Sequence, residues 1–346
     1  MLGPRYRNDG VPRLTLNSVQ RTAKSEIEEK IRLGKYRFET FPCAICSKMS
    51  FEILAEKERY GIPNSVVICR ECGLIQANPR MTNATAHEFF EKESRRLWEG
   101  IEGPSNSAFE RHLGKSTDIW EFIHSHFCLS KKRPQLVVEV GCGIGSILGY
   151  FRDKGFRTLG IDIAGDYVSF GKSQFGLDLR VCTTEQLDLL GEKADLIIYS
   201  STLEFCPDPI TELRTAARFL SDNGLMYIGV AGIKKLRETY ESDFLFLLQE
   251  SLVCYFSFRT LRNAAQMAGL ENIKGTEFVR SLWRKVETEA VSNLKLENDY
   301  ADSMRALRSA EFWRPFYSSV PIKLGRKVFG DFTGALRRIL NDKHSP

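Results

Sequence analysis

Short apolar runs alternate with helical stretches in the middle of the chain. The apolar runs predict strands at Leu136–Val140, Thr158–Ile163, Ala194–Ser200 and Leu225–Val230. Residues Pro209–Leu220 place apolar side chains on one face at helical spacing and predict a helix. Strands that are apolar on both faces are typical of a parallel sheet covered by helices on each side. We therefore expect a doubly covered α/β sheet at residues 134–277.

The rest of the chain divides into a polar arm, a cysteine-bearing module, a helical connector and a mostly helical extension, at residues 1–34, 35–80, 81–133 and 278–346. Ser25 and Glu28 have capping-box spacing and Gly34 follows as a stop, so the arm is predicted to end in a helix. The cysteine-bearing module contains short strand-like pieces such as Ser65–Ile68. These segments would surround the sheet domain on both sides.

Composition narrows the class of protein only slightly. A chain of 346 residues with 42% hydrophobic residues is long enough for one sizeable core and smaller modules. The formal charge of +5 comes from 49 basic and 44 acidic side chains, which does not indicate a dedicated nucleic-acid surface. No apolar run reaches the length of a membrane span, and Met1–Arg13 does not resemble a signal peptide. We expect a cytoplasmic protein.

A glycine-rich loop follows the first predicted strand of the sheet. Its sequence is Glu139-Val-Gly141-Cys-Gly143-Ile-Gly145-Ser, and the apolar residues after it predict a helix. Glycines allow a sharp turn and a close approach to a ligand, which the first amides of the helix would face. Such a loop by itself also fits the pyrophosphate of a dinucleotide.

An acidic residue at the end of the next predicted strand completes the pattern. Asp162 lies about 20 residues after the loop, where a carboxylate can accept hydrogen bonds from both hydroxyls of a ribose. Glu139 favours S-adenosylmethionine over a dinucleotide, because its negative charge suits a cationic amino-acid ligand and repels a pyrophosphate. The alternative is a glycine turn kept for helix packing beside an exposed aspartate.

The order of these motifs resembles that of class I S-adenosylmethionine-dependent methyltransferases, with Thr183-Thr-Glu185 and Ser200-Ser-Thr-Leu-Glu204-Phe-Cys-Pro207-Asp-Pro209 as the later motifs. The resemblance implies that the glycine loop holds the methionine part, Asp162 the ribose, and Ile163 with Thr184 and Glu185 the adenine rim. The implied cofactor residues are Glu139, Gly141, Cys142, Gly143, Gly145, Asp162, Ile163, Thr184, Glu185, Ser200 and Ser201.

Two cysteine pairs predict a metal site ahead of the sheet domain. Cys43-x-x-Cys46 and Cys69-x-x-Cys72 are separated by 22 residues, which is typical of a closed, structural zinc site with four thiolates. Buried or disulfide-linked cysteines are the alternative. The remaining five are interpreted as small buried hydrophobes: Cys128, Cys142, Cys182, Cys206 and Cys254.

The combined layout resembles the zinc-ribbon methyltransferases, a family that includes sugar-nucleotide C-methyltransferases and relatives in polysaccharide biosynthesis. The resemblance spans roughly Phe41–Gly275. It implies a Rossmann-like sheet with helices on both faces, preceded by a zinc ribbon and a helical connector and followed by a helical tail. The implied acceptor is a small molecule or a glycan precursor such as a sugar nucleotide.

The sequence departs from the sugar C-methyltransferases where those enzymes carry histidines and tyrosines. Ser201 and Phe205 flank Glu204 in place of histidines, while Phe90, Ser94 and Trp98 stand where the connector commonly has tyrosines. Proton abstraction from carbon needs a positioned base, so we expect O-methylation, which demands less. Glu204 is the candidate base, and a surface or helix-capping carboxylate is the alternative. His112, His124 and His126 are more readily interpreted as solvated or packing residues.

Two further segments allow more than one interpretation. Residues 232–257 are aromatic-rich and occupy the place of a substrate cap, although such a stripe also fits a core. The apolar and basic residues from Arg326 to Leu340 fit packing against the domain, a homodimer contact or an anionic membrane.

Two other functions remain open from the sequence. The zinc ribbon could serve an RNA or DNA methyltransferase, but Lys48, Lys57 and Arg59 are interspersed with glutamates, so no basic stripe forms and nucleic acid is disfavoured. The second alternative is a scaffold that keeps the cofactor fold without catalysis.

Overall fold

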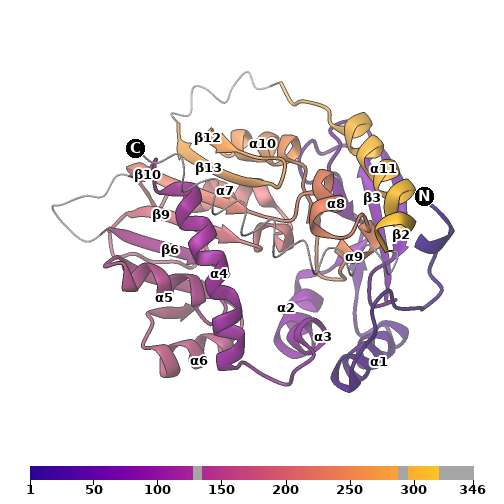
Figure 1. The fold of residues 1–346 in the computed structure, drawn as a ribbon, viewed down its shortest axis with the longest axis horizontal. Helices are drawn as coiled ribbons and strands as arrows, with labels where there is room; N and C mark the ends of the chain where they lie inside the picture. Colours follow the sequence, from indigo (N-terminus) through magenta and orange to yellow (C-terminus); the bar gives the residue numbers. More distant parts are fainter. Residues whose placement is uncertain (128–134, 287–294, 319–346) are drawn as a thin grey trace.

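The computed structural model describes residues 1–127, 135–286 and 295–318, without the side chains of residues 108, 111, 112 and 318. Its centre is a seven-stranded sheet in the order β12-β13-β10-β9-β6-β7-β8 (Figure 1). The strands are β6 (Leu136–Val140), β7 (Arg157–Asp162), β8 (Leu179–Val181), β9 (Ala194–Ser200), β10 (Leu220–Gly229), β12 (Leu270–Gly275) and β13 (Arg280–Lys285). Strands β6 to β10 pair in parallel, and the β12–β13 hairpin adds two antiparallel strands.

Helices cover both faces of this sheet, as the apolar strands predicted. One face carries α4 (Asn106–Ile123), α5 (Ser146–Asp153) and α6 (Gly165–Phe175); the other carries α7 (Pro209–Ala217) and α10 (Phe258–Met267). Successive residues of β6 alternate between the two cores, because side chains along a strand point to opposite faces. Leu136, Val138 and Val140 pack in one core and Val137 in the other. The predicted fold class is confirmed.

The helix predicted at Pro209 begins as expected and ends earlier. Asp208 is its N-cap and accepts the backbone N–H of Thr211 at 3.0 Å, with Pro209 in the first turn. The helix stops at Ala217, since Leu220 already pairs with Ala194 in the sheet.

The start of the helix in the N-terminal arm differs from the capping-box prediction. Helix α1 spans Ser18–Arg32, and its capping box is formed by Asn17 and Gln20. Ser25 therefore lies inside the helix, because the earlier Asn–Gln pair already satisfies the first free amides. The end is as predicted, with Gly34 in the left-handed region two residues beyond.

The helical interpretation of the extension is wrong for its first part. Residues Arg280–Lys285 form β13, so the sheet continues past residue 277. Leu282 and Trp283 alternate between the two cores, which a strand permits and a helix does not. Helix α11 (Tyr300–Ser318) matches the helical prediction, and residues 319–346 lie outside the described chain.

A second, four-stranded sheet contains the cysteine-bearing module, in the order β11-β4-β3-β2. Its strands are β2 (Phe51–Lys57), β3 (Pro63–Cys69), β4 (Ile75–Ala77) and β11 (Cys254–Tyr255). Strand β11 comes from the predicted cap, which also contains η3 (Ile233–Lys235), α8 (Leu236–Thr239) and α9 (Phe244–Leu247). Residues 35–80 are therefore part of a sheet that another segment completes.

The four-stranded sheet packs on both of its sides. Cys43, Ile45 and Leu74 share a core with α7, α10 and the large sheet. The opposite side, with Val66 and Ile68, packs against α8, α9 and α11. The predicted metal site thus lies in a core that the module shares with its neighbours.

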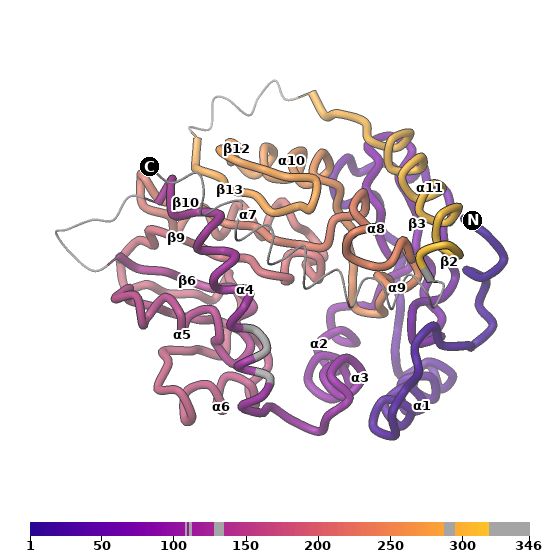
Figure 2. Tube along the Cα trace, viewed as in Figure 1, coloured from indigo at the N-terminus to yellow at the C-terminus, as the bar shows by residue number. Residues whose placement is uncertain are grey.

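The connector consists of α2 (Asn83–Lys92), α3 (Ser94–Glu99) and α4, and a two-stranded pair of β1 (Phe38–Glu39) with β5 (Arg80–Met81) precedes it. Short turns complete the elements, η1 (Pro4–Tyr6) and η2 (Leu203–Phe205). The trace in Figure 2 shows α2 and α3 below the space between the two sheets, and α4 against the large sheet. Among the helices described, none has the length and apolarity that crossing a membrane requires.

Gly73 tests how tightly the cysteine-bearing module is held. Its φ is +82°, and a Cβ there would lie 2.5 Å from backbone atoms of Asp299 and Tyr300. We predict that Gly73→Ala lowers the free energy of unfolding by about 2–4 kcal/mol, combining left-handed strain with overpacking.

The matched control is Gly34→Ala, because Gly34 has a φ of +67° and nothing within 4 Å of such a Cβ. Urea unfolding of both variants separates the two contributions. Equal losses in the two variants would show that the contact with Asp299 and Tyr300 carries no energy.

Candidate functional site

The glycine loop lies where the parallel sheet changes direction. The chain runs from β6 outward to β7 and β8 and then returns to β9 on the other side of β6, so the carboxyl end of β6 is a switch point where such sheets bind ligands. Gly141, Gly143 and Gly145 all have φ between +54° and +79°. At Gly141 a Cβ would lie 2.4 Å from the Thr202 hydroxyl, so glycine is required here for two reasons.

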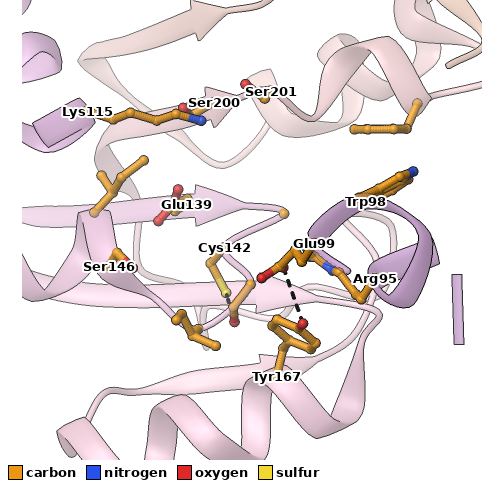
Figure 3. A pocket seen from close by; sticks show the side chains of 15 residues that line it. Arg95, Trp98, Glu99, Lys115, Glu139, Cys142, Ser146, Tyr167, Ser200 and Ser201 are labelled. Carbon is orange, nitrogen blue, oxygen red and sulfur yellow. Dashed lines mark hydrogen bonds and ion pairs between the residues drawn. The ribbon is translucent and has the colours of Figure 1, made fainter. Parts of the chain in front are cut away.

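A cavity of about 220 Å³ opens above this loop (Figure 3). It is lined by Arg95, Trp98, Glu99, Lys115, Glu139, Gly141, Cys142, Gly143, Ile144, Ser146, Ile147, Tyr167, Ser200, Ser201 and Phe205. Six of the predicted cofactor residues are among them, from the glycine loop and from the end of β9. The structure thus brings together two motifs that lie about 60 residues apart in the sequence.

Glu139 is a carboxyl group in a strand that is otherwise apolar. The residue is only 3% exposed, and its Oε2 has no hydrogen-bond partner among the described residues. Burial raises the pKa of Glu139 well above its ordinary value and nearby Asp162 raises it further, whereas Lys115 lowers it. A buried carboxyl without a partner is costly. A cationic ligand in the cavity would offset this cost.

Asp162 ends β7 and holds the glycine loop in place. Its carboxylate accepts the backbone N–H of Gly143 at 2.7 Å and that of Ala164 at 2.8 Å. Its side chain does not line the cavity, so its role toward a ribose stays a prediction.

The rest of the predicted cofactor residues also lie outside the cavity lining: Gly145, Ile163, Thr184 and Glu185. Thr184 is buried and donates to Glu212 at 2.5 Å, so its side chain supports α7. Ile163 and Glu185 are exposed. Their predicted place at an adenine rim is not tested by these contacts.

The connector supplies cavity residues that sequence reasoning did not assign to the cofactor. Arg95, Trp98 and Glu99 come from α3, and Tyr167 of α6 donates to Glu99 at 3.2 Å across the cavity (Figure 3). The Arg95 guanidinium lies 4.5 Å from the centre of the Tyr167 ring. The sequence analysis singled out Trp98 only because it replaces a tyrosine that is common in the connector of the sugar C-methyltransferases. The contact between α3 and α6 has no signal in local sequence.

A second cavity of about 350 Å³ adjoins the first and shares Lys115, Ser200, Ser201 and Phe205 with it. Its own lining includes residues of α4, β10, β13 and the predicted cap: Asp118, Ile119, Glu204, Tyr227, Gly229, Val230, Ala231, Gly232, Thr239, Tyr240, Leu247, Gln249, Leu252, Phe278 and Arg280. The segment 232–257 therefore does shape a cavity next to the predicted cofactor residues.

Glu204 is the buried acid of the second cavity. Its Oε2 has no hydrogen-bond partner in the described chain, and burial raises its pKa to about 7 while Lys115 lowers it. The backbone carbonyl of Glu204 accepts the N–H of Val253 at 2.9 Å, which fixes η2 against the cap. The alternative of an exposed surface carboxylate is wrong. A carboxyl group with a pKa near neutrality can exchange protons with a ligand.

Aromatic side chains form the wall between the connector and the two cavities. Phe205 stacks on Trp98, with ring centres 5.4 Å apart, and meets Phe90 edge-on at 5.7 Å. Three of the positions that carry histidines or tyrosines in the sugar C-methyltransferases, here Phe90, Trp98 and Phe205, thus pack on one another. Ser201, the other replaced histidine position, lines both cavities.

Lys115 and the connector histidines differ in their position relative to the cavities. Lys115 lies at the junction of both cavities and makes no hydrogen bond or ion pair with any side chain described. His124 and His126 contact only neighbouring residues of the same segment and line neither cavity. The side chain of His112 lies outside the described residues.

The four predicted metal ligands converge. The sulfur atoms of Cys43, Cys46, Cys69 and Cys72 all lie within 4.8 Å of one another. Both knuckles have the same backbone hydrogen bond, from Ser47 to Cys43 and from Gly73 to Cys69, each 2.9 Å. Tetrahedral zinc with four thiolates separates sulfur atoms by about 3.8 Å, so this arrangement fits the ion. None of the eight cysteines in the described residues forms a disulfide.

Basic side chains of the cysteine-bearing module are engaged within the protein. Lys57 is buried and forms an ion pair with Asp9 at 2.5 Å. Arg70 pairs with Glu52 at 3.0 Å. Two basic groups of the module are therefore paired with acids of the same chain.

The cavity above the glycine loop fits S-adenosylmethionine by its donor and acceptor groups. Glu139 offers an unpartnered carboxyl oxygen to a cation, and the N-cap of α5 at Gly145 leaves the first helical amides without a side-chain partner. Helix N-termini with such amides favour anionic groups like a carboxylate. The cofactor's amino-acid end carries both charges.

The comparisons with known proteins agree with this fit. Residues 121–274 match a family described as methyltransferase domain. The ubiquinone biosynthesis O-methyltransferase of Bartonella tribocorum is 27% identical over 121 residues, covering 31% of this chain and 49% of the relative. That of Rhodopseudomonas palustris strain BisB18 is 30% identical over 106 residues, covering 29% and 40%. The chain thus spans about half or less of these relatives.

A solved structure, magnesium protoporphyrin IX methyltransferase from Synechocystis PCC 6803 with bound SAH, superposes with a TM-score of 0.43 and 15% identity, covering 58% of this chain and 98% of that one. The family match falls on the segment that carries the sheet order, the glycine loop and the buried Glu139. The middle of this chain is therefore a class I S-adenosylmethionine-dependent methyltransferase domain.

Proposed function

We propose that the protein transfers a methyl group from S-adenosylmethionine to a hydroxyl group of a small molecule or a glycan precursor. The observation that carries this proposal is the pair of adjoining cavities, one above the glycine loop and one around Glu204. They meet at Ser200 and Ser201, so a donor and an acceptor bound in them would face each other at the end of β9. Such alignment can supply about 7–11 kcal/mol of the barrier.

In the first cavity, the chain's own groups would position the donor. Glu139 would accept hydrogen bonds from an ammonium group, and the amides at the start of α5 would face a carboxylate. When bound, S-adenosylmethionine supplies an electrophilic methyl group on a sulfonium. Trp98 and Phe205 would exclude water from this side, because their rings stack over the junction.

In the second cavity, Glu204 would act as the general base. The unpartnered Oε2 would accept the proton of the acceptor hydroxyl, and the pKa of about 7 suits proton transfer near neutral pH. Tyr240 lines the same cavity, and Glu204 contributes to raising the pKa of its hydroxyl. Tyr240 would therefore stay protonated and could donate a hydrogen bond to the acceptor.

Hydroxyl acceptors are favoured over carbon acceptors. The positions that would carry a proton-abstracting apparatus for carbon are occupied by packed aromatic rings and Ser201. The curated relatives named above are O-methyltransferases. A sugar nucleotide or surface-polysaccharide intermediate is our first choice of acceptor, from the resemblance in layout to zinc-ribbon methyltransferases.

A structural zinc ion forms part of the proposal. The four thiols have the spacing that the ion requires, and their surroundings are buried and apolar. A closed site without a free position would give the metal no contact with an acceptor. Its role would be to fix the module whose strand β4 pairs with β11 of the cap.

Release of S-adenosylhomocysteine during incubation with a panel of hydroxylated small molecules and sugar nucleotides tests the activity. Turnover with a hydroxylated acceptor and none with its deoxy analogue is expected. Cofactor binding without turnover on any member would instead favour a scaffold.

The cofactor site generates a prediction about binding affinity. Asp162→Ala should weaken S-adenosylmethionine binding about 10- to 100-fold, because the loop loses a charge-assisted hydrogen bond and the ribose its acceptor. Isothermal titration calorimetry measures the affinity. Asp166→Ala is the control, since Asp166 is exposed and lies only four residues away. Equal affinities of the Asp162 variant and the wild type would contradict the assignment.

Glu204 generates a pH-dependent prediction. A base must be unprotonated, so kcat/KM should rise with pH up to about 7 and then level off. Glu204→Gln should lower kcat about 100-fold or more and abolish this rise. Glu238→Gln, an acid in the cap that pairs with Lys235, should change neither. An unchanged pH profile in the Glu204 variant would remove it as the base.

The metal site generates a prediction about metal content and thermal stability. Native mass spectrometry should find one zinc ion per chain, and Cys69→Ser should lose it while Cys182→Ser keeps it, because Cys182 lies outside the cluster. Removal of the ion by a chelator should lower Tm by about 5 °C or more, since binding stabilises only the folded module. Metal-free protein with an unaltered Tm would argue against a structural ion.

A further inference from the structure

Helix α11 is apolar on its inner side and is fixed there by charged contacts. Met304, Leu307 and Ala310 are buried in the core beneath α8 and α9. Glu311 accepts a hydrogen bond from Arg5 at 2.9 Å and another from the Tyr6 hydroxyl. The helix therefore has a firm place beside the four-stranded sheet (Figure 1).

The outer side of the same helix exposes large aromatic side chains. Phe312 is 75% exposed, Trp313 47% and Phe316 55%, and their rings contact one another. Exposed residues on this side recur at helical spacing, from Arg305 and Arg308 to Phe312 and Phe316. A helix that is apolar on both sides normally has a second covering surface.

We propose that the outer face of α11, formed by Arg305, Arg308, Phe312 and Trp313, docks on an anionic lipid bilayer. The aromatic rings would enter the interface between headgroups and acyl chains, where tryptophan and phenylalanine are favoured. The arginines on the same side would contact lipid phosphates with their guanidinium groups.

Charge selects a bilayer over a second copy of the chain. The outer face carries Arg305 and Arg308, while the nearest acids are already paired: Asp302 with Arg259 and with Arg305 itself, and Glu311 with Arg5 and Arg314. Two copies facing each other would bring four arginines together, and each nearby acid is already paired within its own chain. The sequence that follows, residues 319–346, adds six lysines and arginines against two aspartates, so its charge also favours an anionic surface.

The position of α11 links this surface to the second cavity. The inner side of the helix packs on α8 and α9, which carry Thr239 and Leu247 of the cavity lining. Docking would therefore hold α8 and α9, which contribute to the lining of the second cavity, close to the membrane. This inference does not require the proposed methyl transfer.

Sedimentation of the full chain with vesicles tests the proposal. Vesicles of phosphatidylglycerol and phosphatidylcholine in equal parts should bind the protein, with weaker binding at high salt, and pure phosphatidylcholine should bind it far less. The double variant Phe312→Ser, Trp313→Ser should bind the anionic vesicles at least about tenfold more weakly. Arg305→Gln with Arg308→Gln should reduce the salt dependence.

The control is Val181→Ser with Leu190→Ser, which removes equally exposed apolar residues, 57% and 85%, from the edge of the large sheet. It should bind vesicles like the wild type. An unchanged Tm and unchanged S-adenosylmethionine affinity would show that the aromatic variant is folded. Equal vesicle binding by all variants would overturn the proposal, as would a dimer in ultracentrifugation that the aromatic substitutions dissociate.

Discussion

The pairing of β11 with β4 is the contact on which the arrangement of this protein depends. Cys254 and Tyr255 lie opposite Gln76 and Ile75, so a segment inserted between β10 and β12 of the large sheet completes a sheet begun about 200 residues earlier. Strand edges need partners for their backbone groups, and this pairing satisfies β4 while it fixes the cap. The second cavity exists because the cap is held there.

Two carboxyl groups, those of Glu139 and Glu204, are buried at the two cavities among largely apolar neighbours. Glu139 and Glu204 each have an oxygen without a partner among the described residues, and burial raises the pKa of both. Lys115 lies between them and lowers both pKa values. Because uncompensated charge in a core is costly, residues of this kind persist where a ligand supplies the missing interaction. This is the reason for proposing a donor site in one cavity and an acceptor site in the other.

Local rules predicted much of the fold. The strands of the parallel sheet, the Asp208 cap and the cysteine cluster follow from periodicity, capping chemistry and ligand spacing, all of which act over a few residues. Competing local signals caused the error in α1, where Asn17 caps the helix ahead of Ser25. The strand at Arg280–Lys285 was missed because its pairing with β10 and β12 supplies the stabilisation that its own pattern does not reveal.

By itself, the sequence determined the glycine loop, the acid after the next strand and the four thiols, since each depends on residue type and spacing within a short segment. The tertiary structure alone decided that Trp98 of α3 stacks on Phe205, that Tyr167 joins Glu99 across the cavity, and that the cap shares a sheet with the cysteine-bearing module. These contacts join residues 68 to 180 positions apart. Their energies arise from packing and hydrogen bonding between distant segments, which no local pattern records.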